Sequence, residues 1–254
     1  MVKMKIIVMV ASLALLGGAC AQDDAPETEA EVEQVSLELG SVPDSVEGNV
    51  VSLPVEVEGI EIVAPDGDDS GDSGHFHVFI DRRPVEEGEI IPREAGVVHS
   101  ADNPIQLYGL EPGEHEFTVV LGNGLHERIL EPVSDSVTVD VEGPSVDGTA
   151  PATIEEGEDL TVELAAEGIE IVAADGDTSG DSGHFHVLVD PEEPPAAGEV
   201  IPEPEEGKVY HTTEDSVTVP DLASGDHVIW VVIGDGTHEA LDPPVMDRIA
   251  VTVG

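Results

Sequence analysis

Short runs in which apolar and polar residues alternate cover most of the chain and predict β-strands. Turn-forming groups such as Pro65-Asp66-Gly67 and Gly122-Asn123-Gly124 separate the runs. Outside the first 20 residues no window has the period of an amphipathic helix. The runs expected to hold strands are 35–40, 49–59, 60–64, 75–81, 105–110, 114–122, 134–142, 159–165, 169–173, 184–190, 217–222, 226–234 and 246–254.

An internal duplication divides the chain into two halves. Residues 58–78 and 167–187 are identical at 19 of 21 positions, and the strand pattern restarts after the Gly- and Pro-containing stretch 143–156. About seven short strands per half are typical of a β-sandwich. We therefore predict an all-β protein with two tandem immunoglobulin-like antiparallel β-sandwich domains, domain 1 at residues 35–142 and domain 2, with its linker, at 143–254.

The first 20 residues have the features of an export signal. Lys3 and Lys5 precede an apolar run at 6–16, which is too short for a stable membrane span, and Gly17-Gly18-Ala19 then precede Cys20. This order resembles a bacterial lipoprotein signal, although Gly17 stands where Leu is usual. We predict a signal peptide at 1–20 and a lipid on Cys20, which is the only cysteine; a free structural thiol is the alternative.

Acidic residues dominate the rest of the chain. Residues 21–34 have no apolar period and are predicted to form a disordered acidic tether between the lipid and domain 1. Loss of the signal would leave 56 acidic and 6 basic residues, a charge that excludes nucleic acid as a partner. This charge indicates either a surface adapted to salt or cation capture. The predicted location is the cell envelope, anchored to the membrane through Cys20, with Ala21 favouring the outer membrane or periplasm in a Gram-negative source.

All ten histidines of the chain pair between the two halves. Two of the five pairs lie in the segments 100–142 and 212–254, which agree at only 14 of 43 positions, and a third pair directly precedes them, so the pairing indicates a retained role. The pairs are His75/His184, His77/His186, His99/His211, His115/His227 and His126/His238.

His75 and His77 lie two residues apart on one strand, so both imidazoles should share a face, opposite Phe76, Val78 and Ile80. In an immunoglobulin-like order the strand of His115 would be the neighbour, and His126 would follow in a loop. We predict a Zn or Cu site in each domain, built from His75, His77, His115 and His126 in domain 1 and from their counterparts His184, His186, His227 and His238 in domain 2, with His99 and His211 less certain. Structural hydrogen bonding by these histidines is the alternative.

An Asp-, Ser- and Gly-rich loop precedes each His-x-His sequence. Its spacing resembles the first half of a calcium-binding loop, although His77 stands where the last ligand, Glu, would be. An acidic turn that leads into the strand is the alternative. The candidate Ca²⁺ ligands are Asp66, Asp68, Ser70 and Asp72 in domain 1, and Asp175, Asp177, Ser179 and Asp181 in domain 2.

The same loop contains Gly71-Asp72-Ser73-Gly74, the sequence found around the nucleophile of chymotrypsin-like proteases. A catalytic triad needs a base and an orienting acid on a scaffold about twice the size of one domain, and no other protease-like segment is present. We therefore predict that the protein is not an enzyme.

Each half resembles the bacterial family DUF4399, a domain of unknown function. The residues that carry the resemblance in domain 1 are 59–64, 74–81, 88–92, 110–115, 122–126 and 132–139, and those in domain 2 include 183–190, 225–227, 234–238 and 243–249. The family typically has a third histidine where Phe76 and Phe185 stand, so one possible ligand per domain is absent. The resemblance implies small exported β-domains with a His-rich site and no established activity.

These observations favour an exported, lipid-anchored protein that binds a divalent metal or a small ligand through a His cluster in each domain. A non-catalytic structural or adhesion module with Ca²⁺-stabilised acidic loops is the second hypothesis. An enzyme is the third.

Overall fold

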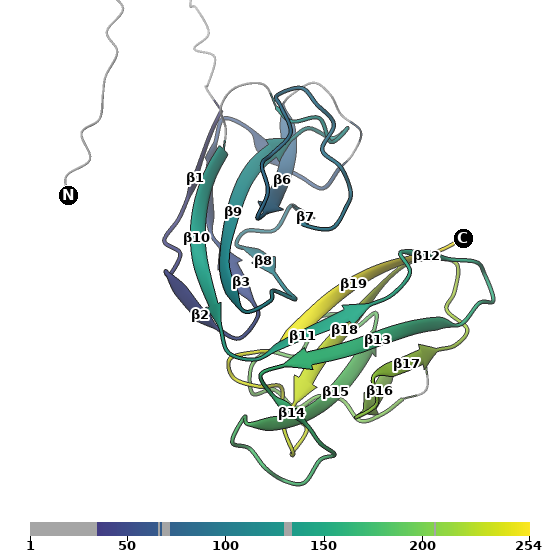
Figure 1. Cartoon of the computed structure of the whole chain (residues 1–254). Coiled ribbons are helices and arrows are strands. Elements are labelled where there is room, and N and C mark those ends of the chain that lie inside the picture. Colours follow the sequence, from purple (N-terminus) through teal and green to yellow (C-terminus); the bar gives the residue numbers. More distant parts are fainter. Residues whose placement is uncertain (1–34, 66, 68–71, 130–133, 206) are drawn as a thin grey trace, which may run out of the picture. The chain divides into compact units, whose positions relative to one another are not determined.

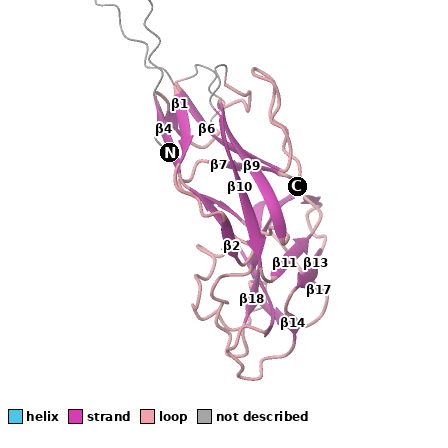
Figure 2. Cartoon of the chain, turned by 60° about the vertical axis from the view of Figure 1, so that its left-hand side comes forward, coloured by secondary structure: helices cyan, strands magenta, loops and turns pink. Residues whose placement is uncertain are grey.

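The computed structural model describes residues 35–254 except 66, 68–71, 130–133 and 206. All regular elements in this part are β-strands joined by loops, as Figures 1 and 2 show. No helix among these residues is long and apolar enough to cross a membrane. The expected signal peptide, the lipidated Cys20 and the tether lie outside the described residues.

Domain 1 consists of strands that form two facing layers. One layer is a sheet of order β2-β10-β9-β6-β5, in which β7 also pairs with β6. The other layer consists of the pairs β1-β4 and β3-β8. The strands are β1 (Ser36–Leu39), β2 (Ser45–Glu47), β3 (Val51–Leu53), β4 (Val55–Glu58), β5 (Glu61–Ile62), β6 (Ser73–Ile80), β7 (Val97–Ser100), β8 (Ile105–Leu107), β9 (Gly113–Gly122) and β10 (Ser134–Glu142).

Domain 2 repeats this arrangement. Its larger sheet has the order β12-β19-β18-β15-β14 with β16 beside β15, and its smaller sheet has the order β11-β13-β17. The strands are β11 (Ser145–Thr149), β12 (Thr153–Ile154), β13 (Leu160–Glu167), β14 (Glu170–Ile171), β15 (Ser182–Val189), β16 (Val209–Thr212), β17 (Ser216–Val219), β18 (Gly225–Gly234) and β19 (Met246–Val253).

One strand of the smaller sheet is continuous in domain 2 and broken in domain 1. β13 runs through Glu163, whereas the equivalent Pro54 separates β3 from β4. Proline has no backbone N–H to give to the ladder, so it interrupts the pairing. The carbonyl of Pro54 still accepts a hydrogen bond from the Gly40 N–H at 2.7 Å, which keeps the interrupted strand beside its neighbour.

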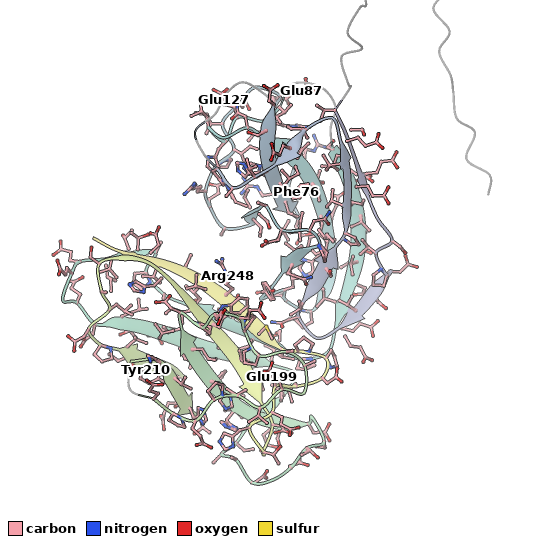
Figure 3. All side chains as sticks on the ribbon, turned by 180° about the vertical axis from the view of Figure 1, so that it is seen from behind. Phe76, Glu87, Glu127, Glu199, Tyr210 and Arg248 are labelled. Atoms are coloured by element: carbon pink, nitrogen blue, oxygen red, sulfur yellow. The ribbon has the colours of Figure 1, made fainter. Side chains whose placement is uncertain are left out.

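Each domain has its own core between its two sheets. In domain 1, Phe76 and Val78 of β6 pack against apolar residues of β3, β8, β9 and β10. In domain 2, Phe185 and Val187 of β15 pack equivalently against β13, β17, β18 and β19. Figure 3 shows the side chains, with Phe76 labelled on the ribbon. The predicted tandem immunoglobulin-like sandwiches and the predicted core face of the His-x-His strand are confirmed.

A second buried layer covers the outer face of each larger sheet. In domain 1 the loop between β6 and β7 brings Ile91 onto Phe79, Val97 and Val120. The loop is held by the Ile91 N–H, which donates to the His126 carbonyl at 2.7 Å. β6 is therefore buried on both faces along most of its length. This second layer contains the histidines.

Candidate metal centres

The His-x-His sequences lie on the outer faces of the two larger sheets. His75 and His77 are 1% and 0% exposed, and His184 and His186 are 3% and 0% exposed. Alternation along β6 points the intervening Phe76 into the sandwich core. A histidine at this position would point away from His75 and His77. The prediction that Phe76 and Phe185 remove a ligand from the cluster is therefore wrong on geometric grounds.

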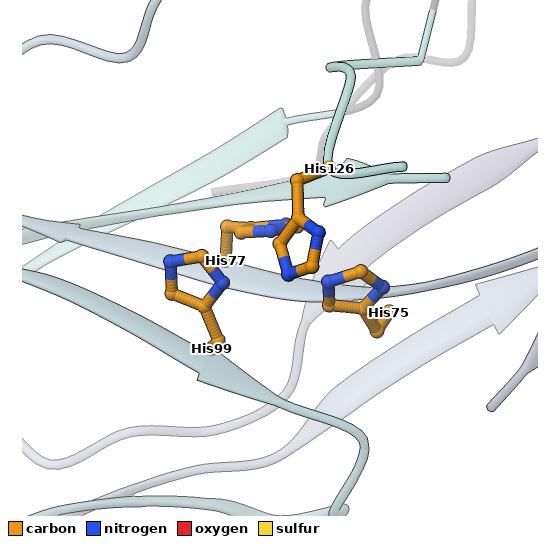
Figure 4. Close-up of side chains that lie close together, drawn as sticks. All are labelled: His75, His77, His99 and His126. Atoms are coloured by element: carbon orange, nitrogen blue, oxygen red, sulfur yellow. The ribbon is translucent and has the colours of Figure 1, made fainter. Parts of the chain in front are cut away.

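Two further histidines reach the same face from other segments. His99 lies on β7, directly opposite His77 in the β6–β7 ladder. His126 lies in the turn after β9, whose residue Gly122 is opposite His75. Domain 2 brings His211 and His238 to His184 and His186 through the equivalent strand and turn. Each cluster thus combines residues from three separate segments, as Figure 4 shows for domain 1.

The four rings of each cluster are in contact. In domain 1 the ring centroid of His77 lies 4.3 Å from that of His75 and 4.5 Å from that of His99. The His126 centroid is 4.8 Å from that of His75. The matching distances in domain 2 are 4.3, 4.2 and 4.8 Å. The duplicated sequences therefore form nearly the same constellation twice.

One nitrogen from each ring can face a common centre. In both clusters four such nitrogens lie within 4.8 Å of one another. Tetrahedral Zn–N bonds of about 2.0–2.1 Å place the nitrogens roughly 3.4 Å apart, so the rings have to close by roughly 1 Å. Imidazole nitrogen is a ligand for Zn, Cu, Ni and Fe. The donor set is therefore suitable for a divalent transition metal.

A strained turn aims the fourth histidine of each cluster. His126 and His238 have φ angles of 65° and 66°, in the left-handed region that is uncommon for residues other than glycine. In domain 1, Asn123 Oδ1 accepts hydrogen bonds from the backbone N–H groups of Leu125 and Glu127. In domain 2, Asp235 Oδ1 accepts the bonds of Thr237 and Glu239.

Two glycines leave room for the central imidazoles. A Cβ atom on Gly122 would lie 2.3 Å from Cε1 of His77, and one on Gly234 would lie 2.3 Å from Cε1 of His186. Real Cβ atoms do not approach so closely, so only glycine leaves room for these rings beside the neighbouring strand. From the sequence, Gly122 was expected in a turn and Gly234 at the end of the strand 226–234, and neither was expected to position a histidine.

The hydrogen bonds of the clusters leave lone pairs available. The ring nitrogens of His77, His184 and His186 are buried and have no hydrogen-bond partner among the described residues. His99 Nε2 donates to the Pro92 carbonyl at 3.2 Å, which leaves the buried Nδ1 as an unprotonated, unpartnered atom. His211 Nε2 donates to Pro202 at 2.9 Å. Carbonyls that fix the tautomer in this way are common behind metal-bound histidines.

Burial keeps these imidazoles neutral. Desolvation, followed by repulsion from the neighbouring histidines, lowers the pKa of His77 and of His186 to about 2. Desolvation also lowers the pKa of His184 to about 4. Burying a polar nitrogen without a partner costs about 1–3 kcal/mol. Neutral, desolvated imidazoles are the form that binds metal, and a bound ion would satisfy their lone pairs.

The structure does not bring His115 and His227 to the clusters. β6 does neighbour β9, as predicted, but the register pairs His77 with Val120. His115 lies five residues from Val120 and so points to the opposite face, where its ring stacks on Phe117 at 6.0 Å. Both of its nitrogens are engaged, Nδ1 with Asp81 at 2.6 Å and Nε2 with the Glu111 carbonyl at 2.7 Å. His227 makes the same contacts with Asp190 and Ala223.

The His115–Asp81 and His227–Asp190 pairs should make stability depend on pH. Desolvation lowers the pKa of His115, but bonds to Glu111 and Asp81 outweigh it and raise that pKa above its usual value. Hydrogen bonds to the Ala223 carbonyl and to the Asp190 carboxylate raise the pKa of His227. A histidine whose pKa is raised on folding stabilises the fold fully at pH values below its unfolded-state pKa. This contribution is lost as the pH rises through its folded-state pKa.

We therefore expect His115→Gln/His227→Gln to destabilise the protein at pH 5.5 and to have a smaller effect at pH 8.5. The Asp partners are about half exposed, so each pair should contribute no more than about 1 kcal/mol. Urea unfolding of both proteins with a chelator present measures the difference. An equal loss at the two pH values would contradict this role.

The acidic loop of domain 2 makes hydrogen bonds within itself. Asp175 Oδ1 accepts the Asp177 N–H at 2.9 Å, and Asp177 accepts the N–H and hydroxyl of Ser179. These are turn-forming bonds of the Asx type. In domain 1 the candidates Asp66, Asp68 and Ser70 lie outside the described residues, and Asp72 is exposed. Calcium binding by these loops, including Asp181, stays a prediction.

A protein-family model shows to which family the chain belongs. The model of DUF4399, described as a domain of unknown function, matches residues 53–142 and again residues 162–254. The chain belongs to the DUF4399 family. Each DUF4399 domain contains one complete four-histidine cluster. A search of curated proteins found no match.

Solved structures resemble the chain only weakly. A mutant of Salmonella alpha-2-macroglobulin shares 13% identity with a TM-score of 0.26, and the match covers 89% of this chain and 15% of that one. Alpha-2-macroglobulin of E. coli shares 11% with a TM-score of 0.28, covering 89% and 17%. A tetra-tandem repeat from the extending region of a large adhesion protein shares 13% with a TM-score of 0.22, covering 87% and 49%. The chain thus spans less than half the length of each.

Proposed function

We propose that this protein binds divalent transition metal ions, one in each DUF4399 domain, through His75, His77, His99 and His126 and through His184, His186, His211 and His238. The observation that carries the proposal is the convergence of four imidazoles in each domain, with one nitrogen of each within 4.8 Å of the others. The unpartnered buried nitrogens support it, because a metal ion would recover the free energy lost by desolvation.

The proposed setting is the cell envelope, with the chain attached to the membrane through a lipid on Cys20. The sequence of residues 1–20 and the large excess of acidic residues support this setting. A negatively charged surface raises the local concentration of cations near the sites. A neutral all-imidazole donor set suits Zn²⁺ and Cu²⁺ among other ions, and these two are the ions that we propose.

Elemental analysis of the mature protein tests the proposal. The protein should be produced without a histidine tag, exposed to equal concentrations of Zn²⁺, Cu²⁺, Ni²⁺ and Ca²⁺, and freed of loose ions by gel filtration. We expect two transition metal ions per chain to remain bound. Protein that retains no transition metal would contradict the proposed function and favour structural hydrogen bonding by the histidines.

A further inference from the structure

The two clusters have the same four histidines but different charged neighbours. In domain 1, Arg93 follows the Ile91-Pro92 pair of the covering loop, and its Nη2 lies 3.0 Å from Nε2 of His126. In domain 2, Ile201 and Pro202 make the equivalent contacts, and the next residue is Glu203. The residue at this position beside the cluster is therefore positively charged in domain 1 and negatively charged in domain 2.

A second difference between the two sites also makes domain 2 more negative than domain 1. The buried residue that builds the turn before the fourth histidine is the neutral Asn123 in domain 1 and Asp235 in domain 2. The two side chains have almost the same shape and accept equivalent backbone hydrogen bonds. At these two positions the formal charge is +1 in domain 1, from Arg93 alone, and −2 in domain 2, from Glu203 and Asp235.

Arg93 competes directly with a metal ion for His126. A guanidinium only donates, so Nε2 of His126 accepts from Arg93 and the ring proton lies on Nδ1. A metal on Nε2 would take the lone pair that Arg93 uses. A metal on Nδ1 would move the proton to Nε2 and turn the acceptor into a donor. Metal binding through either nitrogen therefore breaks the contact with Arg93.

Arg93 is also without a carboxylate partner among the described residues, in a chain with 56 acidic and 8 basic residues. Among the other described basic residues, Arg82 pairs with Glu94 at 2.7 Å and Lys208 pairs with Glu205 at 2.8 Å, whereas Arg83, Arg128 and Arg248 also have no carboxylate partner in this part of the chain. The side chain of Arg93 is exposed, so a released guanidinium stays beside the cluster and open to solvent. Guanidinium next to a divalent cation creates a strong site for an anion.

We infer that the two sites are not equivalent: the domain 2 site holds a divalent metal ion by itself, whereas the domain 1 site binds the metal together with a small anion held by the metal and Arg93. The inference rests on the proposed metal binding. The anion would be a carboxylate or an inorganic anion small enough to bridge the ion and the guanidinium. Glu203 and Asp235 supply the equivalent negative charge in domain 2.

The charge difference predicts the size of the effect. For a divalent ion about 6 Å from a unit charge, even the dielectric constant of water gives roughly a tenfold change in affinity, which salt then reduces. Three units of charge separate the two neighbourhoods. Without added anion, we expect the domain 2 site to bind at least about 100-fold more tightly at low salt.

Proteins with one intact cluster separate the two sites. His186→Gln leaves the domain 1 site, and His77→Gln leaves the domain 2 site. Each is titrated with Co²⁺ in a non-coordinating buffer, with and without azide as the anionic probe, while the visible spectrum reports Co²⁺ and azide ligation. Azide should raise Co²⁺ affinity about tenfold or more at the domain 1 site and should leave the domain 2 site unchanged.

Exchange of the charged neighbours provides the matched variants. Arg93→Glu, added to His186→Gln, should abolish the azide effect and strengthen binding of Co²⁺ alone. Glu203→Arg, added to His77→Gln, should weaken Co²⁺ binding and introduce the azide effect. Both positions are exposed, so the fold should be retained, and circular dichroism checks this. Arg93→Gln controls for loss of the guanidinium without a new charge.

Three outcomes would overturn the inference. Equal Co²⁺ affinities with equal responses to azide would show that the sites are equivalent. An azide effect that survives Arg93→Glu would show that Arg93 does not hold the anion. Absence of Co²⁺ binding in both single-cluster proteins would overturn the proposed function as well, which distinguishes that failure from the first two.

Discussion

Replacement of His77 by glutamine should lower the bound transition metal from two ions per chain to one. His77 is fully buried at the centre of its cluster, with ring contacts to the other three histidines. Loss of a residue that hydrogen-bonds to a metal ligand typically lowers metal affinity 10–100-fold, so loss of the ligand itself should lower it more than about 100-fold. His77→Gln/His186→Gln should retain no metal.

The matched control is His115→Gln/His227→Gln, which removes the same number of histidines from the same two domains. Both nitrogens of His115 are already hydrogen-bonded on the opposite side of the sheet. This control should keep two ions per chain by elemental analysis. Full retention of metal in His77→Gln/His186→Gln, or loss of metal in the control, would contradict the assignment of ligands.

Replacement of Gly234 by alanine should remove the metal of domain 2 although no ligand changes. The added Cβ would lie 2.3 Å from Cε1 and 2.8 Å from Nδ1 of His186, so the imidazole has to leave its position. The backbone φ of Gly234 is not positive, so alanine introduces no backbone strain there. We expect one ion per chain, and Gly122→Ala should have the same effect on domain 1.

A double substitution separates displacement of the ring from damage to the strand. His186→Gln/Gly234→Ala removes the imidazole that the new methyl group meets, so the two effects on unfolding free energy should not be additive. Urea unfolding with a chelator present measures the coupling. Additive effects, or retention of the domain 2 metal in Gly234→Ala, would show that the glycine does not position His186.

The face of the sheet on which His115 lies could not be predicted from the sequence. The neighbouring strands β6 and β9 were predicted correctly, but the face on which His115 lies depends on the register. Side chains alternate along a strand, so a histidine an odd number of residues from Val120 faces the other way. The turns and covering loops set this register, and alternation within a single strand contains no information about it.

The strands β7 and β16 were not predicted, and this explains why His99 and His211 were considered uncertain ligands. β7 has four residues and β16 has four, and neither shows a clear alternation of apolar and polar positions. Both are stabilised by pairing with β6 or β15 and by the covering loop. A segment that is ordered mainly by its neighbours gives a weak local signal.

The sequence by itself determined the duplication, the all-β class, the core face of the His-x-His strand and the pairing of all ten histidines, because these follow from local periodicity and from comparing the two halves. Tertiary structure alone decided which histidines converge. Register excluded His115 and His227, pairing with a short strand added His99 and His211, and glycine at 122 and 234 made room for the central rings. These are distances between segments far apart in the chain, and only the packing of the sheet fixes them.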